Sequence, residues 1–291
     1  MELREIIDRI DAVSIPKEAT ITQLKHEEDN GFYQVWRIDT PDGKYILKET
    51  KGNEHVLYPA VFSAAPRMIP ALHQVVTIED KTYLLTEYIE GENLCCCNRT
   101  NLKLTLDALI ALQQATWELD CLGAFFDESL LQRQNRGMYL NDSLLEEAYE
   151  KFLEVYQATP KALCHDDLLP FNIVTSEKQA FLIDWEYGGM LPYPTSFARL
   201  IAHAEENPDA FFYMTQEDKC FAVDYYYEHL LKEKGISYAD WKNTLEYFLF
   251  YEYCEWVFVG NKYHATDGEY YKKYLPMAKR QAAKILKKSD L

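Results

Sequence analysis

The spacing of apolar residues changes near residue 90, and this change divides the chain into two parts. Before it, short apolar runs separated by polar turns predict β-strands, whose alternate residues face opposite sides of a sheet. After it, apolar residues recur with the spacing of one helix face, which predicts amphipathic helices. The pattern therefore predicts a β-rich first part and a mainly helical second part, which is the α+β class.

Turn-forming residues separate the expected strands of the first part. Asn30-Gly31 and Pro41-Asp42-Gly43 are turn signals, and the β-branched and aromatic residues between them predict a strand. Pro59 marks a break or kink in the helical segment that follows. The expected elements are an amphipathic helix at residues 1–13, a β-meander at 19–50, a helix at 52–64, and strands at 73–78 and 82–89.

Helical periodicity dominates the second part from Asn101 onward. Asp142 or Ser143 precedes one periodic segment, and we expect one of them to cap its first turn. No internal repeat or low-complexity segment is visible. The expected helices lie at residues 102–118, 143–157, 196–203, 216–234, 238–259 and 269–288.

A polar loop interrupts this pattern and carries the clearest chemistry in the chain. His165, Asp167 and Asn172 have the spacing His-x-Asp-x-x-x-x-Asn. A kinase-type active site uses this spacing, because phosphoryl transfer needs a positioned hydroxyl, a base and metal ions more than covalent help from the protein. Asp167 is therefore the candidate base, whereas His165 is expected to pin the catalytic loop.

A second motif supports this interpretation. Phe181-Leu182-Ile183 is an apolar strand that ends in Asp184. Together with Ile173-Val174 it predicts a hairpin around a polar turn, which returns Asn172 to the side of Asp184. Amide and carboxylate oxygens are hard donors that suit Mg²⁺, so Asn172 and Asp184 are the candidate metal ligands. The alternative is a polar loop between a helix and a strand.

The strand Tyr45-Ile46-Leu47-Lys48 places an apolar residue and a lysine on one face. This pair suits a nucleotide, with Ile46 against adenine and Lys48 on the α- and β-phosphates. Glu54, in the first turn of the next helix, is the best candidate to pair with Lys48, and His55 and Glu49 are also near in sequence. The alternative for Lys48 is a surface position on an edge strand.

The segment Glu90-Gly91-Glu92-Asn93 ends the strand pattern, and we place the boundary between two lobes there. Residues 1–90 are expected to form a β-rich nucleotide-binding lobe. Residues 91–291 are expected to form a helical lobe with the catalytic loop and the acceptor site. In a kinase the crossing segment offers backbone groups to adenine, so the hinge candidates are Glu87, Tyr88 and Ile89.

Composition narrows the class of protein. The 291 residues suffice for one two-lobed domain or two small ones. The net charge of −17 disfavours nucleic acid as a partner; it favours a cationic acceptor, or it serves solubility alone. No apolar run has the length of a membrane span and the N-terminus lacks a signal-peptide core, so we expect a cytoplasmic protein. Seven cysteines without a C-x-x-C pair argue against disulfides or zinc, and no pattern indicates an oligomeric state.

The acceptor site is expected on the aromatic helix at 238–259. Glu252, Glu255 and Trp256 share a face there, and carboxylates beside an aromatic ring bind ammonium groups through charge and cation–π attraction. The alternative is a buried aromatic helix with an acidic edge. Glu186 and Asp166, next to the candidate catalytic residues, would add negative charge.

The two motifs together resemble those of the aminoglycoside phosphotransferase and choline kinase family of small-molecule kinases. The family signatures H-x-D-L-x-P-x-N and I-D-W-E match residues 165–172 and 183–186. Leu168 and Pro170 favour this family over protein kinases, which carry Arg before the Asp. The resemblance implies a protein-kinase-like two-lobed fold, with a small antiparallel sheet in the N-lobe and a mainly helical C-lobe.

The resemblance also implies a reaction and a role for each matched residue. The reaction is transfer of the γ-phosphoryl group of ATP or GTP to a hydroxyl of a small molecule, in the presence of Mg²⁺. The implied roles are catalytic base for Asp167, Mg²⁺ ligands for Asn172 and Asp184, phosphate clamp for Lys48, orientation of Lys48 for Glu54, and a cover over the phosphates for the turn at Asn30-Gly31.

Two positions depart from the family pattern. Ser196 stands near an expected helix-opening Asp, and Gln113-Gln114 stands where the family often has Leu-His. Neither change removes a metal ligand, so the subfamily and the acceptor stay open. The alternatives are a catalytically weak, kinase-like nucleotide-binding protein, and a kinase for a neutral sugar or homoserine. A protein kinase is disfavoured because no activation segment follows Asp184.

Overall fold

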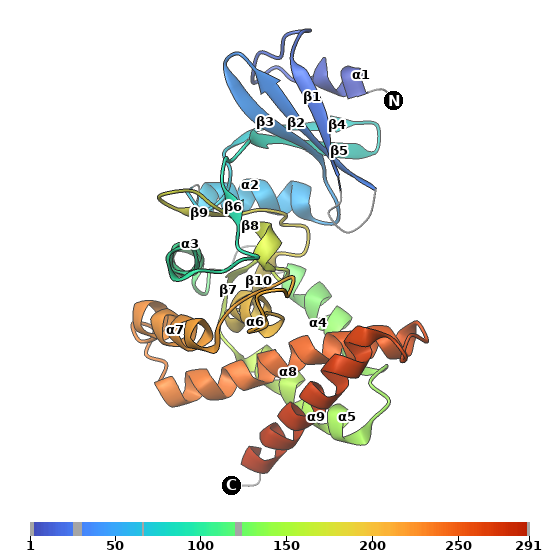
Figure 1. Ribbon diagram of the computed structural model, residues 1–291, viewed down its shortest axis with the longest axis vertical. Coiled ribbons are helices and arrows are strands. Elements are labelled where there is room, and N and C mark those ends of the chain that lie inside the picture. Colours follow the sequence, from blue (N-terminus) through green and yellow to red (C-terminus); the bar gives the residue numbers. More distant parts are fainter. Residues whose placement is uncertain (1–2, 26–30, 66, 120–123, 290–291) are drawn as a thin grey trace.

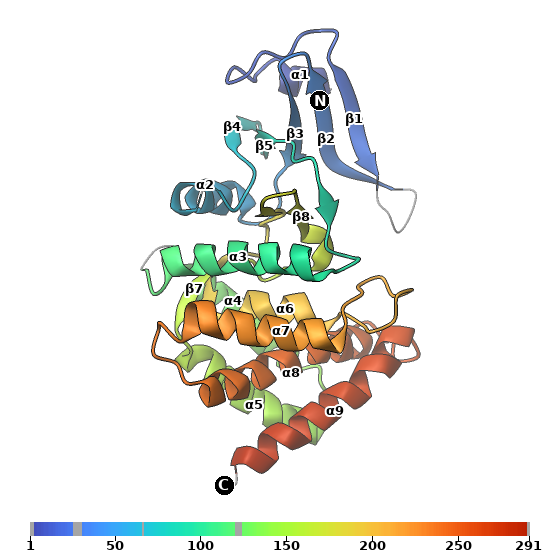
Figure 2. The ribbon, with the colours of Figure 1, turned by 60° about the vertical axis from the view of Figure 1, so that its left-hand side comes forward.

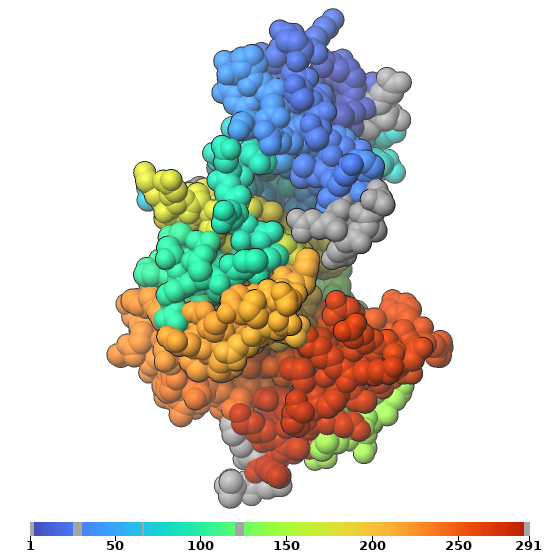
Figure 3. Space-filling model, in the orientation of Figure 1, coloured from blue at the N-terminus to red at the C-terminus, as the bar shows by residue number. Residues whose placement is uncertain are grey.

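The computed structural model describes residues 3–25, 31–65, 67–119 and 124–289 and stacks a β-rich part on a helical part (Figure 1). The β-rich part is an antiparallel five-stranded sheet of order β1-β2-β3-β5-β4. The surface is recessed where the two parts meet (Figure 3). The strands are β1 (Thr20–Lys25), β2 (Phe32–Thr40), β3 (Gly43–Glu49), β4 (Leu72–Ile78) and β5 (Lys81–Glu87).

One face of this sheet forms a small core of its own, into which helix α1 (Leu3–Ile7) contributes Ile6 and Ile7. The helix expected over residues 1–13 is thus wrong beyond Ile7. The amides of Asp11 and Ala12 donate to the Gln74 side chain of β4, each at 3.0 Å, instead of to helix carbonyls. The apolar residues that follow still pack on the sheet, so the apolar pattern was correct while the helix was too long.

Helix α2 (Glu54–Ala64) connects the sheet to the main core, which Leu57 and Val61 enter fully buried. After β5 the chain crosses into the helical part, where β6 (Glu92–Asn93) pairs with β8 (Ile173–Thr175). The expected hairpin is present: β8 pairs with β9 (Ala180–Leu182) in antiparallel register, directly after the short helix η1 (Pro170–Asn172).

Helices make up most of the second part (Figures 1 and 2). Asp142 caps α5 by accepting from the Leu145 amide at 3.3 Å, as expected. Helix α4 and the two-stranded sheet β7–β10 were not expected from the sequence, and the helix expected at residues 216–234 is α7 followed by the π-helical turn η2. The elements are α3 (Arg99–Thr116), α4 (Ala124–Gly137), α5 (Ser143–Ala158), β7 (Lys161–Cys164), β10 (Gly189–Pro192), α6 (Pro194–Ala202), α7 (Gln216–Tyr226), η2 (Tyr227–Leu231), α8 (Tyr238–Lys262) and α9 (Glu269–Ser289).

An aromatic layer packs α5 against α8. Phe152 stacks on Tyr251 with ring centroids 4.9 Å apart and meets Phe248 edge-on at 5.6 Å. Such pairs contribute beyond their buried area, so this layer rigidly supports the elements above it. Within the described ranges, no helix combines the length and the apolar character needed to cross a membrane.

Gly188 lies at a tightly packed junction near the candidate site, and we predict that Gly188→Ala lowers the free energy of unfolding by about 1–3 kcal/mol. An added Cβ would lie 2.6 Å from Leu57 Cδ2, 2.8 Å from Trp185 Cε3 and 3.0 Å from the Cys164 carbonyl oxygen. Urea unfolding measures the change. Gly268→Ala is the control, because a Cβ at that exposed position meets one atom within 4 Å; equal stability of both variants would contradict the prediction.

Candidate active site

The loop after β7 is fixed at His165, which is fully buried. Its amide donates to Ser196 Oγ at 2.8 Å, and its Nε2 lies 2.6 Å from the Ile183 carbonyl oxygen. Burial lowers the pKa of His165 to about 4, so the neutral ring donates from Nε2 to that carbonyl. These two hydrogen bonds hold the catalytic loop in place. The Ser196 hydroxyl anchors the same loop without any charge.

Asp166 adopts a left-handed backbone conformation, with φ of +54°. Its carboxylate accepts from Arg133 Nη2 of α4 at 2.6 Å. Arg133 is only 2% exposed, and its guanidinium lies between the rings of Tyr156 and Tyr251, 4.6 Å from each centroid. The expectation that Asp166 adds negative charge to the acceptor site is therefore wrong, because a buried arginine neutralises it.

Asp167, the candidate base, is held on both carboxylate oxygens. Oδ1 accepts from Arg199 Nη2 at 2.8 Å and Nε at 3.1 Å, and Oδ2 lies 3.3 Å from Asn172 Nδ2. Asn172 Nδ2 also donates to the Asp167 carbonyl oxygen at 2.9 Å. Burial raises the pKa of Asp167 to about 6 against the opposing effect of Arg199. A carboxylate with a pKa near the working pH is suited to accept a proton.

Lys48 of β3 contacts the nearby helix α2 and also Asp184, which lies 136 residues further along the chain. Its Nζ lies 2.8 Å from Glu54 Oε1 of α2 and 2.5 Å from Asp184 Oδ1. Strand β3 is central in the sheet, so the edge-strand alternative for Lys48 does not apply. Burial would lower the pKa of Lys48, but Asp184 and Glu54 outweigh it and raise the pKa, so the amine stays charged. The expected partner, Glu54, is the one that the structure places beside Lys48.

The two candidate metal ligands are held by the hairpin. The Ile183 amide donates to the Asn172 carbonyl oxygen at 3.0 Å, which brings Asn172 close to Asp184. Asp184 itself has a left-handed φ of +66°. The Asn172 amide group uses its nitrogen on Asp167 and keeps its oxygen for another partner. A carboxylate and an amide oxygen fit the preference of Mg²⁺ for hard oxygen donors.

Two backbone amides of the hinge segment are already hydrogen-bonded within the protein. The Glu87 amide donates to the Ala71 carbonyl at 2.9 Å and the Tyr88 amide to the Lys44 carbonyl at 3.0 Å. Among the described residues no acceptor is found for the amide of Ile89. Ile46 of β3 pairs with Thr86 of β5, directly before this segment. Of the expected turn over the phosphates, Asn30 lies outside the described residues and Gly31 directly precedes β2.

The acceptor candidates on α8 are only partly as expected. Glu252 is 2% exposed and pairs with Arg199 Nη1 at 2.9 Å and His203 Nε2 at 3.2 Å. Burial would raise the pKa of Glu252, but Arg199 and His203 outweigh it and lower the pKa to about 2. Glu252 is therefore engaged in a buried ion-pair network, and its place in the acceptor site stays a prediction.

Three other residues remain accessible near the loop. Glu255 is partly exposed, pairs with Arg199 and lies 3.6 Å from Arg136 Nη1. Trp256 stacks on Tyr270 of α9, with ring centroids 4.3 Å apart. Glu186 is partly exposed and has no ion-pair partner among the described residues.

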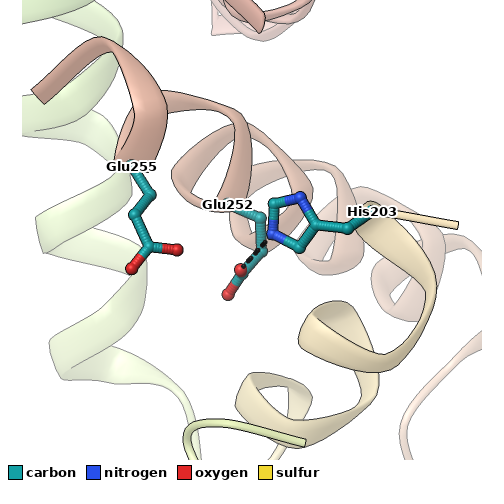
Figure 4. A group of neighbouring side chains, drawn as sticks. All are labelled: His203, Glu252 and Glu255. Carbon is teal, nitrogen blue, oxygen red and sulfur yellow. Dashed lines mark hydrogen bonds and ion pairs between the residues drawn. The ribbon is translucent and has the colours of Figure 1, made fainter. Parts of the chain in front are cut away.

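The side chains of His203, Glu252 and Glu255 converge at one point, where their ligand atoms lie within 4.8 Å of one another (Figure 4). This arrangement resembles a metal centre, but Arg199 Nη1 contacts all three groups. A guanidinium nitrogen already supplies the positive charge, so these residues do not fit a metal ion. Arg199 and Arg133 were missed in the sequence. Ser196, Arg199 and His203 at helical spacing were the available signal for Arg199.

Comparison with known proteins identifies one family for this chain. A model of the phosphotransferase enzyme family matches residues 22–228, well over half of the chain. Protein LicA of Haemophilus influenzae is 24% identical over 208 residues, covering 67% of this chain and 75% of that protein. A second Protein LicA of Haemophilus influenzae has the same identity, and the match spans 59% of its length.

Solved structures extend the likeness over most of the chain. Plasmodium vivax ethanolamine kinase has a TM-score of 0.62 and 13% identity, covering 89% of this chain and 82% of that one. Choline kinase from Cryptosporidium parvum has a TM-score of 0.61 and 12% identity, covering 94% and 91%. Aminoglycoside phosphotransferase from Alicyclobacillus acidocaldarius has a TM-score of 0.59 and 13% identity, covering 100% and 97%. These likenesses confirm the expected protein-kinase-like fold.

The raised pKa of Asp167 predicts that Asp167→Asn stabilises the protein at neutral pH. The pKa of the Asp167 carboxyl is about 6 in the folded protein, against an ordinary value of 3.8. Its contribution to the stability of the fold is therefore complete below pH 3.8 and is lost as the pH rises through 6. The uncharged side-chain amide introduced in Asp167→Asn avoids that loss of stability. We expect a gain on the order of 1 kcal/mol at pH 7.5 that vanishes near pH 4, measured by urea unfolding. A variant no more stable than the parent at pH 7.5 would contradict it.

Proposed function

The chain belongs to the phosphotransferase enzyme family, and from this premise we propose that it transfers the γ-phosphoryl group of ATP or GTP to a hydroxyl of a small, cationic acceptor. The observation that carries the proposal is the junction at Lys48. One ammonium group meets Glu54 and Asp184, and Asn172 and Asp167 lie next along the same chain of contacts. Phosphoryl transfer requires a phosphate-binding cation, metal ligands and a base within such a distance of one another.

The nucleotide would lie between the lobe of residues 1–90 and the lobe of residues 91–291. Lys48 binds the α- and β-phosphates, and Glu54 keeps its ammonium in place. Ile46 faces the adenine, and the amide of Ile89 is available to it while those of Glu87 and Tyr88 are used within the sheet. Gly31 directly precedes β2, the strand that follows the phosphate-covering turn.

Asn172 and Asp184 would hold Mg²⁺, which neutralises charge on the phosphates. Asp184 is now paired with Lys48, and this charged contact keeps the carboxylate pointed into the site. Asp167 orients the acceptor hydroxyl and takes its proton, since its second oxygen is bound only at 3.3 Å. His165 acts through the position of the loop alone.

The acceptor would bind between the catalytic loop and α8. Glu186 lacks a cationic partner among the described residues, Glu255 is partly exposed on α8, and the next residue, Trp256, stacks on Tyr270. Tyr187 is 57% exposed at the same loop. Carboxylates beside aromatic faces favour an ammonium group, and the net charge of −17 draws cations toward the protein.

The second candidate function is a kinase for a neutral sugar or for homoserine. Arg199 and Arg136 already offset the charge of Glu255, which weakens its attraction for a cation. A catalytically weak protein is disfavoured, because Ser196 supplies the loop anchor that the missing aspartate would give.

A screen of nucleotide consumption tests the proposed function. The purified protein is assayed with Mg²⁺, with ATP and with GTP, against choline, ethanolamine, kanamycin, homoserine and glucose. We expect one acceptor to stimulate consumption, and Asp167→Asn to lower that turnover by about 10²–10⁴-fold while still binding nucleotide. If no acceptor raises consumption by the parent above that of Asp167→Asn, the proposal fails.

The cationic acceptor predicts separate effects on KM and kcat. Glu255→Gln should raise the KM of the stimulating acceptor about tenfold, since a charge-assisted contact contributes roughly 1.5–3 kcal/mol. Trp256→Leu should also raise this KM, since a cation–π contact contributes about 0.5–2 kcal/mol. The turnover at saturation should change less. Glu246→Gln is the matched control, because it removes the same charge elsewhere on α8, where Glu246 pairs with Lys284 at 2.8 Å. Parental KM values in both variants, or a neutral stimulating acceptor, would remove these residues from the acceptor site.

A further inference from the structure

Arg199 connects the catalytic loop to the helix that carries the acceptor candidates. It lies on α6, immediately after β10, and its side chain is 14% exposed. Nε and Nη2 both donate to Asp167 Oδ1, at 3.1 and 2.8 Å. Nη1 donates to Glu252 Oε2 at 2.9 Å and also to Glu255 Oε2. One planar group thus spans the loop and α8.

The geometry of a guanidinium makes this contact directional. Its five N–H donors are fixed in one plane, so the edge that faces Asp167 cannot rotate without moving the nitrogen that faces α8. Glu252 is itself held from a further side, because His203 Nε2 lies 3.2 Å from its Oε2 and His203 Nδ1 lies 2.8 Å from Tyr274 OH of α9. The position of the Asp167 carboxylate is therefore set by helices α6, α8 and α9.

We propose that Arg199 is the positioning residue for Asp167, and that it transmits the position of Glu252 to the catalytic loop. The inference rests on the proposed function, in which Asp167 orients the acceptor hydroxyl. In this proposal Arg199 contacts neither the acceptor hydroxyl nor the phosphates, but only the carboxylate of Asp167. It acts by holding Oδ1, so that Oδ2 is left to face the hydroxyl.

The buried charges explain why the network is a unit. Glu252 is almost fully buried, and a buried carboxylate is tolerated only with a partner. Arg199 is that partner, and the attraction of Glu255, Glu252 and Asp167 outweighs burial and raises the pKa of Arg199 well above its usual range. A lysine keeps the charge but has no fork, so it cannot hold both edges at once.

A double-mutant cycle tests the proposal, with the stimulating acceptor of the five named above. We expect Arg199→Lys to lower kcat by about 10²-fold, since small misplacements of a catalytic group have effects of that size, and to leave the KM for ATP unchanged. Glu252→Gln should lower kcat about tenfold. Because both act through one contact, the double variant should be no slower than Arg199→Lys.

Glu246→Gln, combined with Arg199→Lys, is the control pair, and its effects should multiply. Parental kcat in Arg199→Lys, or a double variant with Glu252→Gln whose loss is the product of the single losses, would overturn the proposal.

A spectroscopic measurement separates failure of this inference from failure of the proposed function. The ¹⁵N–¹H signal of Arg199 Nε, identified by its loss in Arg199→Lys or by sequential assignment if that variant does not fold, needs no turnover. It should shift in Asp167→Asn and in Glu252→Gln and stay in place in Glu246→Gln. A signal indifferent to both changes would sink the proposal even if the protein phosphorylates its acceptor.

Discussion

The site depends on the placement of one ammonium group in the interior. Lys48 stands on the central strand of the sheet, and its charge is compensated by Glu54 from α2 and by Asp184 from the hairpin of the helical part. Burying an unpaired charge is costly, so Lys48 and Glu54 can be buried only together, and the partly exposed Asp184 adds a second carboxylate to Lys48. The sheet, α2 and the hairpin must therefore meet at this point, and the electrostatic constraint sets how the β-rich part sits on the helical part.

In the helical part, arginine side chains neutralise carboxylates near the catalytic loop. The chain carries a net charge of −17, and at the catalytic loop Glu252 is buried while Asp166 and Asp167 are half-buried. Arg133 neutralises Asp166 between two tyrosine rings, and Arg199 neutralises Glu252 and shares Asp167. An acidic surface and a nearly balanced interior are thus compatible. The pattern also explains why counting carboxylates in the sequence overstates the negative charge that a ligand would meet.

The sequence predicted the features that are set by local spacing. The hairpin that joins Asn172 to Asp184, the face of β3 that carries Lys48, and the Asp142 cap all follow from residues a few positions apart. It could not predict pairings between distant elements. The pairing of Arg133 with Asp166 and the burial of Glu252 depend on how α4, α6 and α8 pack, which local spacing does not encode. The first helix ended early for the same reason, since Gln74 of β4 takes the amides that the helix needed.

The turn at Asp166 has a consequence for how such a sequence can change over generations. Glycine would adopt a φ of +54° without strain, and relief of that strain is worth roughly 1–2 kcal/mol. A change to glycine alone would nevertheless leave Arg133 buried without its carboxylate, which costs about 3–5 kcal/mol. Replacing Asp166 alone therefore lowers the stability of the fold, whereas replacing Asp166 and Arg133 together need not. The two positions form an epistatic pair, so relatives with glycine in this turn should also lack the buried arginine.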